Sequence, residues 1–179
     1  MVRPSPGERW REWLLLHLEE NAGAWHAVAG EVDAGSFGLL ARLEAVSRAL
    51  AELQRKALDP YGINYAEFTT IGMLRTTRPA MQRSPTELRR LVGQSSAGMT
   101  RILRKLERAR LVRRVPGQGD GRRRDVVLTA KGAVLAEEAF PALFAAPSAR
   151  LSALTKRERD AWLRTLDDLL GFLVRDGER

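Results

Sequence analysis

The sequence predicts a mainly α-helical fold that contains one small β-hairpin. Apolar residues recur at three- and four-residue spacing along most of the 179 residues, and residues suited to cap helices precede several of these stretches. Residues 111–128 differ, because two short stretches with strand character flank PGQGDGRRR, whose proline and glycines forbid a helix. A chain of this length can form one well-buried domain or two small lobes that share a core.

Two helices are expected before residue 60. Residues 8–20 place their tryptophans on one helical face, and a glycine-containing break follows at 21–35. Ser36 is then in the position of an N-cap. The helix that it starts should end at Asp59, because Pro60 disfavours helical geometry in the residue before it.

A third helix is expected from Asn64 to about Arg75. Asn64 is a suitable N-cap, and Glu67 stands at the position that completes a capping box. Ser84 and Glu87 repeat this spacing. A fourth helix should therefore begin there, with a proline at its first position.

Gly93 should end this fourth helix after about two turns, because glycine readily adopts the left-handed conformation that closes a helix. Ser95 or Ser96 is the expected cap of the next helix. Four apolar residues should form the inward face of that helix: Met99, Ile102, Leu103 and Leu106.

Leu111–Val115 and Asp125–Leu128 are the two predicted strands of the hairpin. A helix should start at Thr129 and continue to about Phe140, where Pro141 is expected to interrupt it.

The C-terminal part should contain a loop at Pro147 and then a last helix from Thr155 to about Val174. Glu158 completes a capping box with Thr155. This helix should bury five apolar residues: Trp162, Leu166, Leu169, Leu170 and Leu173.

The excess positive charge of the chain is confined to residues 83–131. This segment holds fourteen Lys and Arg against four Asp and Glu, a net charge of +10, whereas the whole chain carries +8. The remaining residues therefore sum to −2. Charge that is localised in this way forms a patch that attracts a polyanion, and duplex DNA is the predicted partner.

The same segment has the pattern of a helix-turn-helix, with a tight turn at 92–94 and small residues at the start of the second helix. Small residues allow close approach to a phosphate backbone, and arginine is a good donor to guanine. The alternative is that these residues form a solvated helix face. The predicted DNA-binding residues are Ser84, Thr86, Ser95, Ser96, Ala97, Gly98, Thr100, Arg101, Arg104, Lys105, Arg122, Arg123 and Arg124.

The hairpin makes the DNA interpretation more specific. Arg122, Arg123 and Arg124 stand at its tip, from which a guanidinium can enter a minor groove. Asp120 is expected to hold the shape of the tip, for example by pairing with Arg122. The predicted lobe is therefore a winged helix-turn-helix.

Asp120, Arg122, Leu128 and Thr129 form the pattern D-x-R, five residues, L-T, which resembles the wing motif of the multiple antibiotic resistance regulator (MarR) family. The run SSAGMTRILRKLERARLVRR resembles the recognition helix of that family, and the order of helices is similar over residues 36–174. The resemblance implies a homodimer with interlocked terminal helices and two lobes on a pseudo-palindromic operator. One departure is Arg110, where the family usually has glycine, and a looser helix end or a differently shaped turn is expected there.

The predicted domains are an N-terminal helical extension over 1–35, a dimerisation region over 36–60 and 141–179, and a winged helix-turn-helix lobe over 61–140. Helices 36–58 and 155–174 are apolar over more than one face, so a twofold dimer would bury them. The alternative is a monomer whose end helices pack on each other.

Many members of this family are repressors that a small phenolic or anionic molecule releases from DNA. The N-terminal extension resembles that of the urate-responsive branch, which implies an aromatic-anion site at Trp25, Phe68, Thr69 and Arg101. Thr69 replaces an acid of that branch, which argues against urate itself. The alternative is that the tryptophans of the extension pack in a core or a dimer interface.

Other functions find little support in the sequence. There is no cysteine, and the two histidines, nine residues apart, do not form a metal site, so no metal and no cofactor are expected. No apolar run is long enough for a membrane span, and a cytoplasmic location is expected. Catalytic motifs were not found, so an enzyme is not predicted. The open alternative to a ligand-responsive repressor is a constitutive or architectural DNA-binding protein.

Overall fold

The computed structural model describes residue 24 and residues 33–77, 80–117 and 124–174. The predicted helix at 8–20, with Trp10, Trp13 and His17, lies outside these residues, as does His26. The chain divides into two compact units, residues 1–52 and 53–179. Among the described residues, no helix combines the length and the apolar composition that a membrane crossing requires.

Helix α2 (Ala34–Leu58) begins earlier than predicted. The predicted cap at Ser36 was wrong, because the backbone N–H of Ser36 donates to Asp33 Oδ2 at 2.6 Å. Asp33 is therefore the residue that caps the helix, and this hydrogen bond lowers the pKa of its carboxyl. At its other end α2 gives way to a 3-10 turn, η1 (Asp59–Tyr61), close to the predicted boundary.

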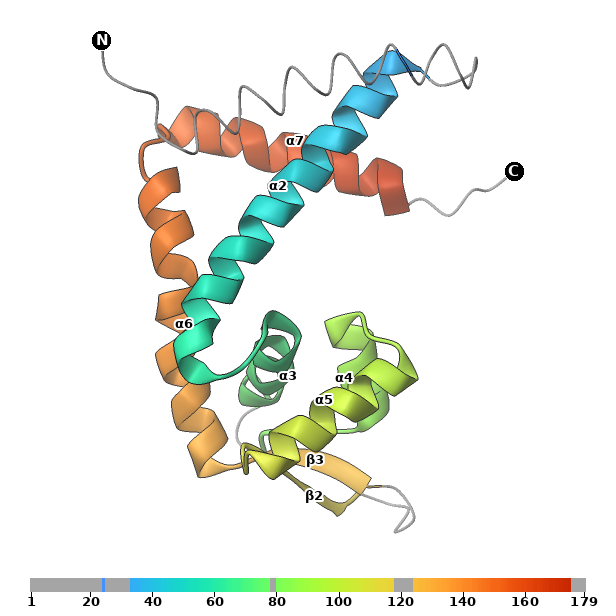
Figure 1. Ribbon diagram of the computed structural model, residues 1–179, viewed down its shortest axis with the longest axis vertical. Coiled ribbons are helices and arrows are strands. Elements are labelled where there is room, and N and C mark those ends of the chain that lie inside the picture. Colours follow the sequence, from blue (N-terminus) through green and yellow to red (C-terminus); the bar gives the residue numbers. More distant parts are fainter. Residues whose placement is uncertain (1–23, 25–32, 78–79, 118–123, 175–179) are drawn as a thin grey trace. The chain divides into compact units, whose positions relative to one another are not determined.

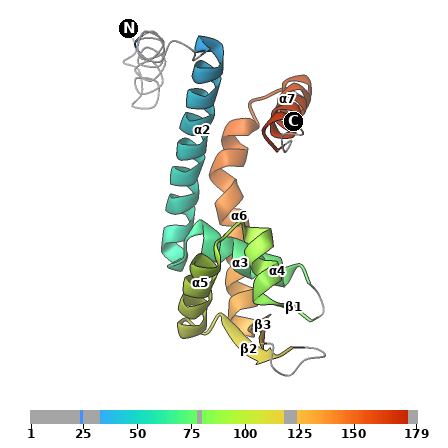
Figure 2. The same ribbon diagram turned by 90° about the vertical axis from the view of Figure 1, so that its right-hand side faces the viewer.

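The three predicted helices of the middle segment are confirmed, as α3 (Tyr65–Arg75), α4 (Pro85–Val92) and α5 (Ser96–Arg108). Their caps are Asn64, Ser84 and Ser95, and the first two form the predicted capping boxes. The helices pack on one another beside the small sheet (Figure 1 and Figure 2). This part of the molecule is the helix-turn-helix lobe.

The sheet has three antiparallel strands in the order β1–β3–β2, rather than the predicted two. Strands β2 (Val112–Pro116) and β3 (Arg124–Leu128) are the predicted hairpin, with Val112 opposite Leu128. The additional strand, β1 (Gln82–Arg83), pairs with β3. A strand of two residues is too short to show an alternating pattern in the sequence. Its strand geometry comes from its pairing with β3, which is distant in the chain.

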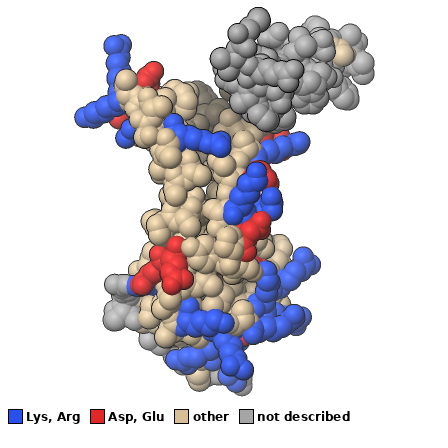
Figure 3. Space-filling view, turned by 60° about the vertical axis from the view of Figure 1, so that its left-hand side comes forward, with Lys and Arg blue, Asp and Glu red and all other residues tan. Residues whose placement is uncertain are grey.

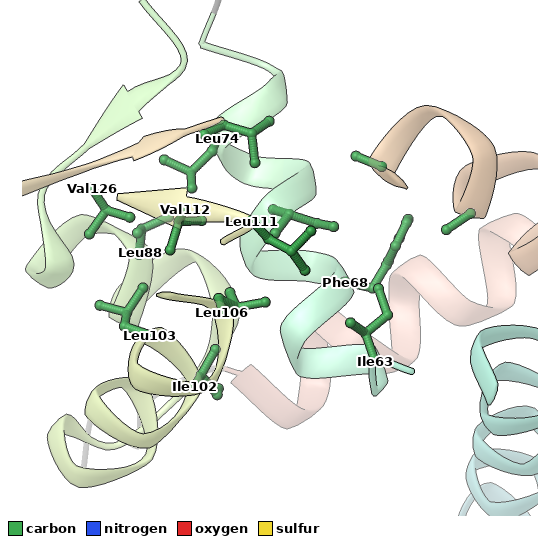
Figure 4. Close-up of a cluster of buried hydrophobic side chains, with 14 of the residues drawn as sticks. Ile63, Phe68, Leu74, Leu88, Ile102, Leu103, Leu106, Leu111, Val112 and Val126 are labelled. Carbon is green, nitrogen blue, oxygen red and sulfur yellow. The ribbon is translucent and has the colours of Figure 1, made fainter. Parts of the chain in front are cut away.

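One hydrophobic core holds these elements together. Figure 4 shows Leu88 of α4, Leu103 and Leu106 of α5 and Val126 of β3 among its side chains. All four inward residues predicted for α5 are buried. Burial of α5 along one face leaves the opposite face free to contact a partner.

Helix α6 (Ala130–Leu151) continues through both Pro141 and Pro147, so the predicted interruption and loop were wrong. Each proline removes one backbone hydrogen bond. Burial of apolar residues on both sides of Pro141, including Ala139 and Leu143, offsets that loss and keeps the helix packed on α3.

Helix α7 (Lys156–Val174) has the predicted capping box of Thr155 and Glu158. Its apolar residues are not buried as predicted: Trp162 is 55% exposed and Leu170 60% exposed in the single chain. The sequence spacing identifies an apolar face of the helix, but it does not say what covers that face.

Candidate nucleic-acid interface

The first helix of the helix-turn-helix, α4, is fixed at its start by Ser84 and Glu87. The Glu87 backbone N–H donates to Ser84 Oγ at 3.2 Å, and Glu87 Oε2 accepts from the Ser84 hydroxyl and the Ser84 N–H at 2.7 and 2.9 Å. The two hydrogen bonds that the carboxylate accepts, the hydroxyl bond first, lower the pKa of Glu87. The predicted contact residue Thr86 is exposed in the same turn.

Two glycines stand in this part of the lobe, Gly93 at the turn between α4 and α5 and Gly98 in the first turn of α5. Gly93 adopts a left-handed conformation with φ 66°, as predicted, and its neighbour Gln94 donates its N–H to the Arg89 carbonyl at 3.0 Å. A Cβ at Gly98 would lie only 3.0 Å from Gln94 Oε1 and 3.2 Å from Ser95 Oγ. The small residues therefore let the turn and the start of α5 pack closely.

The outward face of α5 is a shallow hollow of about 480 Å³. It brings together five of the predicted contact residues and one further arginine on the same helical face. The lining residues are Ser96, Ala97, Thr100, Arg101, Arg104 and Arg108, all of them exposed. Figure 3 shows lysine and arginine side chains gathering on the lower part of the surface in that view.

Two side chains of α5 differ from what the sequence indicates. The Thr100 hydroxyl donates to the Ser96 carbonyl at 2.9 Å, so it can offer a ligand only its oxygen lone pairs. Lys105 Nζ lies 2.8 Å from Glu67 Oε2 of α3. Arg108 was not among the predicted contacts, although its spacing from Arg101 and Arg104 places it on their face.

The end of α5 keeps the hydrogen bonds of a regular helix end although it has an arginine there. Arg110 has φ 59°, and its N–H donates to the Glu107 carbonyl at 2.9 Å, while the Leu111 N–H donates to the Leu106 carbonyl at 2.9 Å. This is the Schellman pattern that usually has glycine at its left-handed position. The turn therefore has the shape that glycine usually gives it, and the expectation of a differently shaped turn was wrong.

Thr129 joins this helix end to the start of α6. Its hydroxyl lies 2.8 Å from the Arg110 carbonyl and 3.0 Å from the Leu111 carbonyl, and it accepts the Gly132 N–H at 3.0 Å. A Cβ at Gly132 would lie 2.1 Å from the Leu111 carbonyl oxygen. Only glycine allows α6 to start so close to the end of α5.

The stem of the wing is tied to α5 by an ion pair between Arg114 Nε and Glu107 Oε1 at 2.8 Å. Arg124, a predicted contact, is exposed at the last pair of the β2–β3 ladder. Asp120, Arg122 and Arg123 lie outside the described residues. The wing residues that the structure describes extend the basic surface beyond α5.

The predicted ligand residues are not brought together. Phe68 and Thr69 line a cavity of about 500 Å³ between α3 and α6, whereas Arg101 lines the hollow on α5. Trp25 lies outside the described residues. The cavity has an ion pair at its edge, in which Arg75 Nε lies 2.9 Å from Glu137 Oε1.

Comparisons with known proteins agree on the kind of molecule. The model of the MarR family matches residues 61–123. An HTH-type transcriptional repressor of Mycobacterium tuberculosis is 34% identical over 141 residues, which cover 78% of this chain and 97% of that protein.

Solved structures show the same fold. A mutant of MarR from E. coli complexed with operator DNA is 25% identical and has a TM-score of 0.62, over 74% of this chain and 90% of that one. The S. aureus MepR–DNA complex is 20% identical with a TM-score of 0.65, over 72% and 93%. These relatives are regulators rather than enzymes. The chain therefore belongs to the MarR family of winged helix-turn-helix transcriptional regulators.

Proposed function

We propose that this regulator binds a pseudo-palindromic DNA site as a homodimer, represses transcription, and is released by a small aromatic or anionic effector. The outward face of α5 carries the proposal. Arg101, Arg104 and Arg108 stand together on the face opposite the core, beside small residues at the helix start. A helix of this kind fits a major groove.

The DNA contacts divide into two kinds. Arg101, near the start of α5, is proposed to read base edges, because the first turns of a recognition helix reach deepest into the groove. Arg104 and Arg108 are proposed to contact phosphates, with Arg122 and Arg123 of the wing in or beside the minor groove. Support for DNA as the partner comes from a mutant of MarR from E. coli, a protein of the same fold that was solved in complex with operator DNA.

The proposal of a homodimer is supported by exposed apolar side chains. Helix α7 carries seven large apolar residues that are about half exposed or more: Trp162, Leu163, Leu166, Leu170, Phe172, Leu173 and Val174. Exposed apolar surface of this extent on one helix is unusual in a monomer. A second copy of the chain would cover it and would place two recognition helices on one duplex.

The cavity between α3 and α6 is proposed as the effector site. Tyr65, Phe68, Phe140 and Phe144 supply aromatic walls, and the last two rings lie 4.9 Å apart at 47°. An apolar cavity with one cation at its edge suits an aromatic ring with an acidic substituent. Such an anion would compete with Glu137 for Arg75, which gives it a way to disturb the packing of α3 on α6.

DNA binding is tested with the duplex that the wild-type protein selects from a random-sequence pool, titrated at two salt concentrations beside unselected DNA. Arg101→Ala is expected to weaken binding to the selected duplex more than to unselected DNA. Arg122→Ala should weaken both and reduce the salt slope by about one unit. Equal effects of the two changes would mean that base readout lies elsewhere.

The effector is tested by repeating that titration with benzoate, phenol and indole. A ligand of the cavity should weaken binding to the selected duplex by a coupling free energy of about 1 to 3 kcal/mol. Arg75→Gln should reduce the effect of benzoate more than that of indole, because only benzoate is an anion. The constitutive alternative predicts tight binding that none of these compounds changes.

A further inference from the structure

Glu67 is a buried carboxylate that serves the start of α3. It is 3% exposed, and its Oε2 accepts the backbone N–H of Asn64 at 3.0 Å within the capping box. A buried negative charge is unfavourable unless a cation accompanies it. The cation here does not come from α3 itself.

The partner of this carboxylate is Lys105 of α5, thirty-eight residues away in the sequence. Lys105 Nζ donates to the same Oε2 at 2.8 Å, and the lysine side chain is 54% exposed. One oxygen of Glu67 therefore receives both the N-cap amide of α3 and an ammonium group of the recognition helix. The ion pair joins two helices that contact each other through the core.

The direction of Lys105 separates it from its neighbour. Successive residues of an α-helix leave the axis about 100° apart. Arg104 lines the outward hollow of α5, whereas Lys105, one residue later, reaches toward α3. Its place on the helix is the border between the DNA-facing side and the core-facing side.

We infer that Lys105 is a positioning residue for DNA recognition, which acts through Glu67. The ion pair holds α5 at one rotation about its own axis, and this rotation sets the direction in which Arg101 and Arg104 leave the protein. A phosphate contact of Lys105 itself is not needed. The inference rests on the proposed DNA-binding function, and it gives the basic residue 105 a task different from that of its neighbours.

Glu67→Gln should change DNA affinity in opposite directions according to whether Glu67 acts only as a negative charge or also positions α5 through Lys105. The amide oxygen of glutamine can still accept the Asn64 N–H, but the attraction for Lys105 is lost. Removal of a negative charge should by itself strengthen DNA binding. Loss of positioning instead predicts about tenfold weaker binding to the selected duplex, with binding to unselected DNA reduced less than twofold. Glu158→Gln is the matched control, because it removes the same charge from the same capping-box position on α7.

Variants of residue 105 give an independent measurement that does not depend on a buried side chain. Lys105→Met should reduce the preference for the selected duplex over unselected DNA, as Glu67→Gln does, and leave the salt slope unchanged. Lys105→Arg keeps the positive charge and should retain that preference. Arg104→Met is the reference for a direct phosphate contact and should lower the salt slope by about 0.9. The effects of Glu67→Gln and Lys105→Met should not add in the double variant.

The opposite results would overturn the inference. A salt slope that falls with Lys105→Met as it does with Arg104→Met would make Lys105 a phosphate contact. Unchanged or stronger selective binding by Glu67→Gln would show that the ion pair does not position the helix. If the wild-type protein selects no sequence at all, the proposed function fails, and that result is distinct from selective wild-type binding that the variants leave intact.

Discussion

Arg110 adopts a left-handed backbone conformation that is unfavourable for a residue with a side chain. Its φ of 59° is unfavourable for a residue with a Cβ, by roughly 1 kcal/mol relative to glycine. Arg110→Gly is therefore expected to raise the free energy of unfolding by up to about 1 kcal/mol, because the Schellman hydrogen bonds remain and the strain is relieved. Urea denaturation measures the change. Arg108→Gly, inside the helix, should have the opposite sign, and a loss of stability in both variants would contradict the argument.

Gly132 should tolerate no larger residue. In Gly132→Ala the new methyl group would lie 2.1 Å from the Leu111 carbonyl oxygen and 2.7 Å from Leu128 Cδ1. Because backbone must move, the free energy of unfolding should fall by about 1 to 3 kcal/mol. Gly72→Ala is the control in calorimetry, since nothing lies within 4 Å of its Cβ position and alanine favours a helix. Gly132→Ala is expected to lower the midpoint temperature of thermal unfolding, and Gly72→Ala is expected to raise it.

At the scale of the element, the start of α4 should depend on pH. Hydrogen bonds from Ser84 lower the pKa of Glu87 below its ordinary value of 4.5, so the folded state favours the ionised carboxylate. The resulting stabilisation is complete above pH 4.5 and is lost as the pH falls through the lowered pKa of the folded protein. Carbon NMR of the Glu87 carboxyl should give a midpoint below 4.5 that rises in Ser84→Ala. A midpoint at or above 4.5 in the wild type would refute the prediction.

The elements that could be predicted from the sequence are those that local interactions determine. Asn64, Ser84 and Thr155 cap their helices through residues three positions away. The spacing of these residues in the sequence is therefore enough to predict the cap. Strand β1 and the continuity of α6 through Pro141 could not be predicted, because both depend on packing against distant segments. The cap of α2 is local too, but Asp33 and Ser36 are both plausible caps, and the sequence does not rank them.

The candidate site shows the same division. The arginines of α5 follow from helical spacing, since positions three and four apart share a face. The ion pair of Glu67 and Lys105 could not be found in this way, because thirty-eight residues separate its members. The spacing places Lys105 beside the arginines of α5. Its contact with Glu67 of α3 is visible only in the tertiary structure.

At the scale of the whole molecule, the exposed face of α7 should determine the oligomeric state. Leu166→Glu places a charge in the middle of that face, where Leu166 is 54% exposed. If the face is a dimer interface, the variant should sediment as a monomer and bind the selected duplex at least tenfold more weakly, because one half-site contact is lost. Thr165→Glu, one residue earlier, is the control for added charge. A wild-type protein that sediments as a monomer at micromolar concentration would exclude the dimer.

The wing is closed at its base, and this has a consequence for how such regulators change over time. Val112 pairs with Leu128, the Thr129 N–H donates to the Leu111 carbonyl at 3.0 Å, and the recognition helix ends just before this point. Whatever lies between Pro116 and Arg124 is thus attached to a stem that is already complete. Insertions, deletions or exchanged tips at this place should leave α5 where it is. Evolution or protein engineering can therefore change the tip of the wing without changing the position of helix α5.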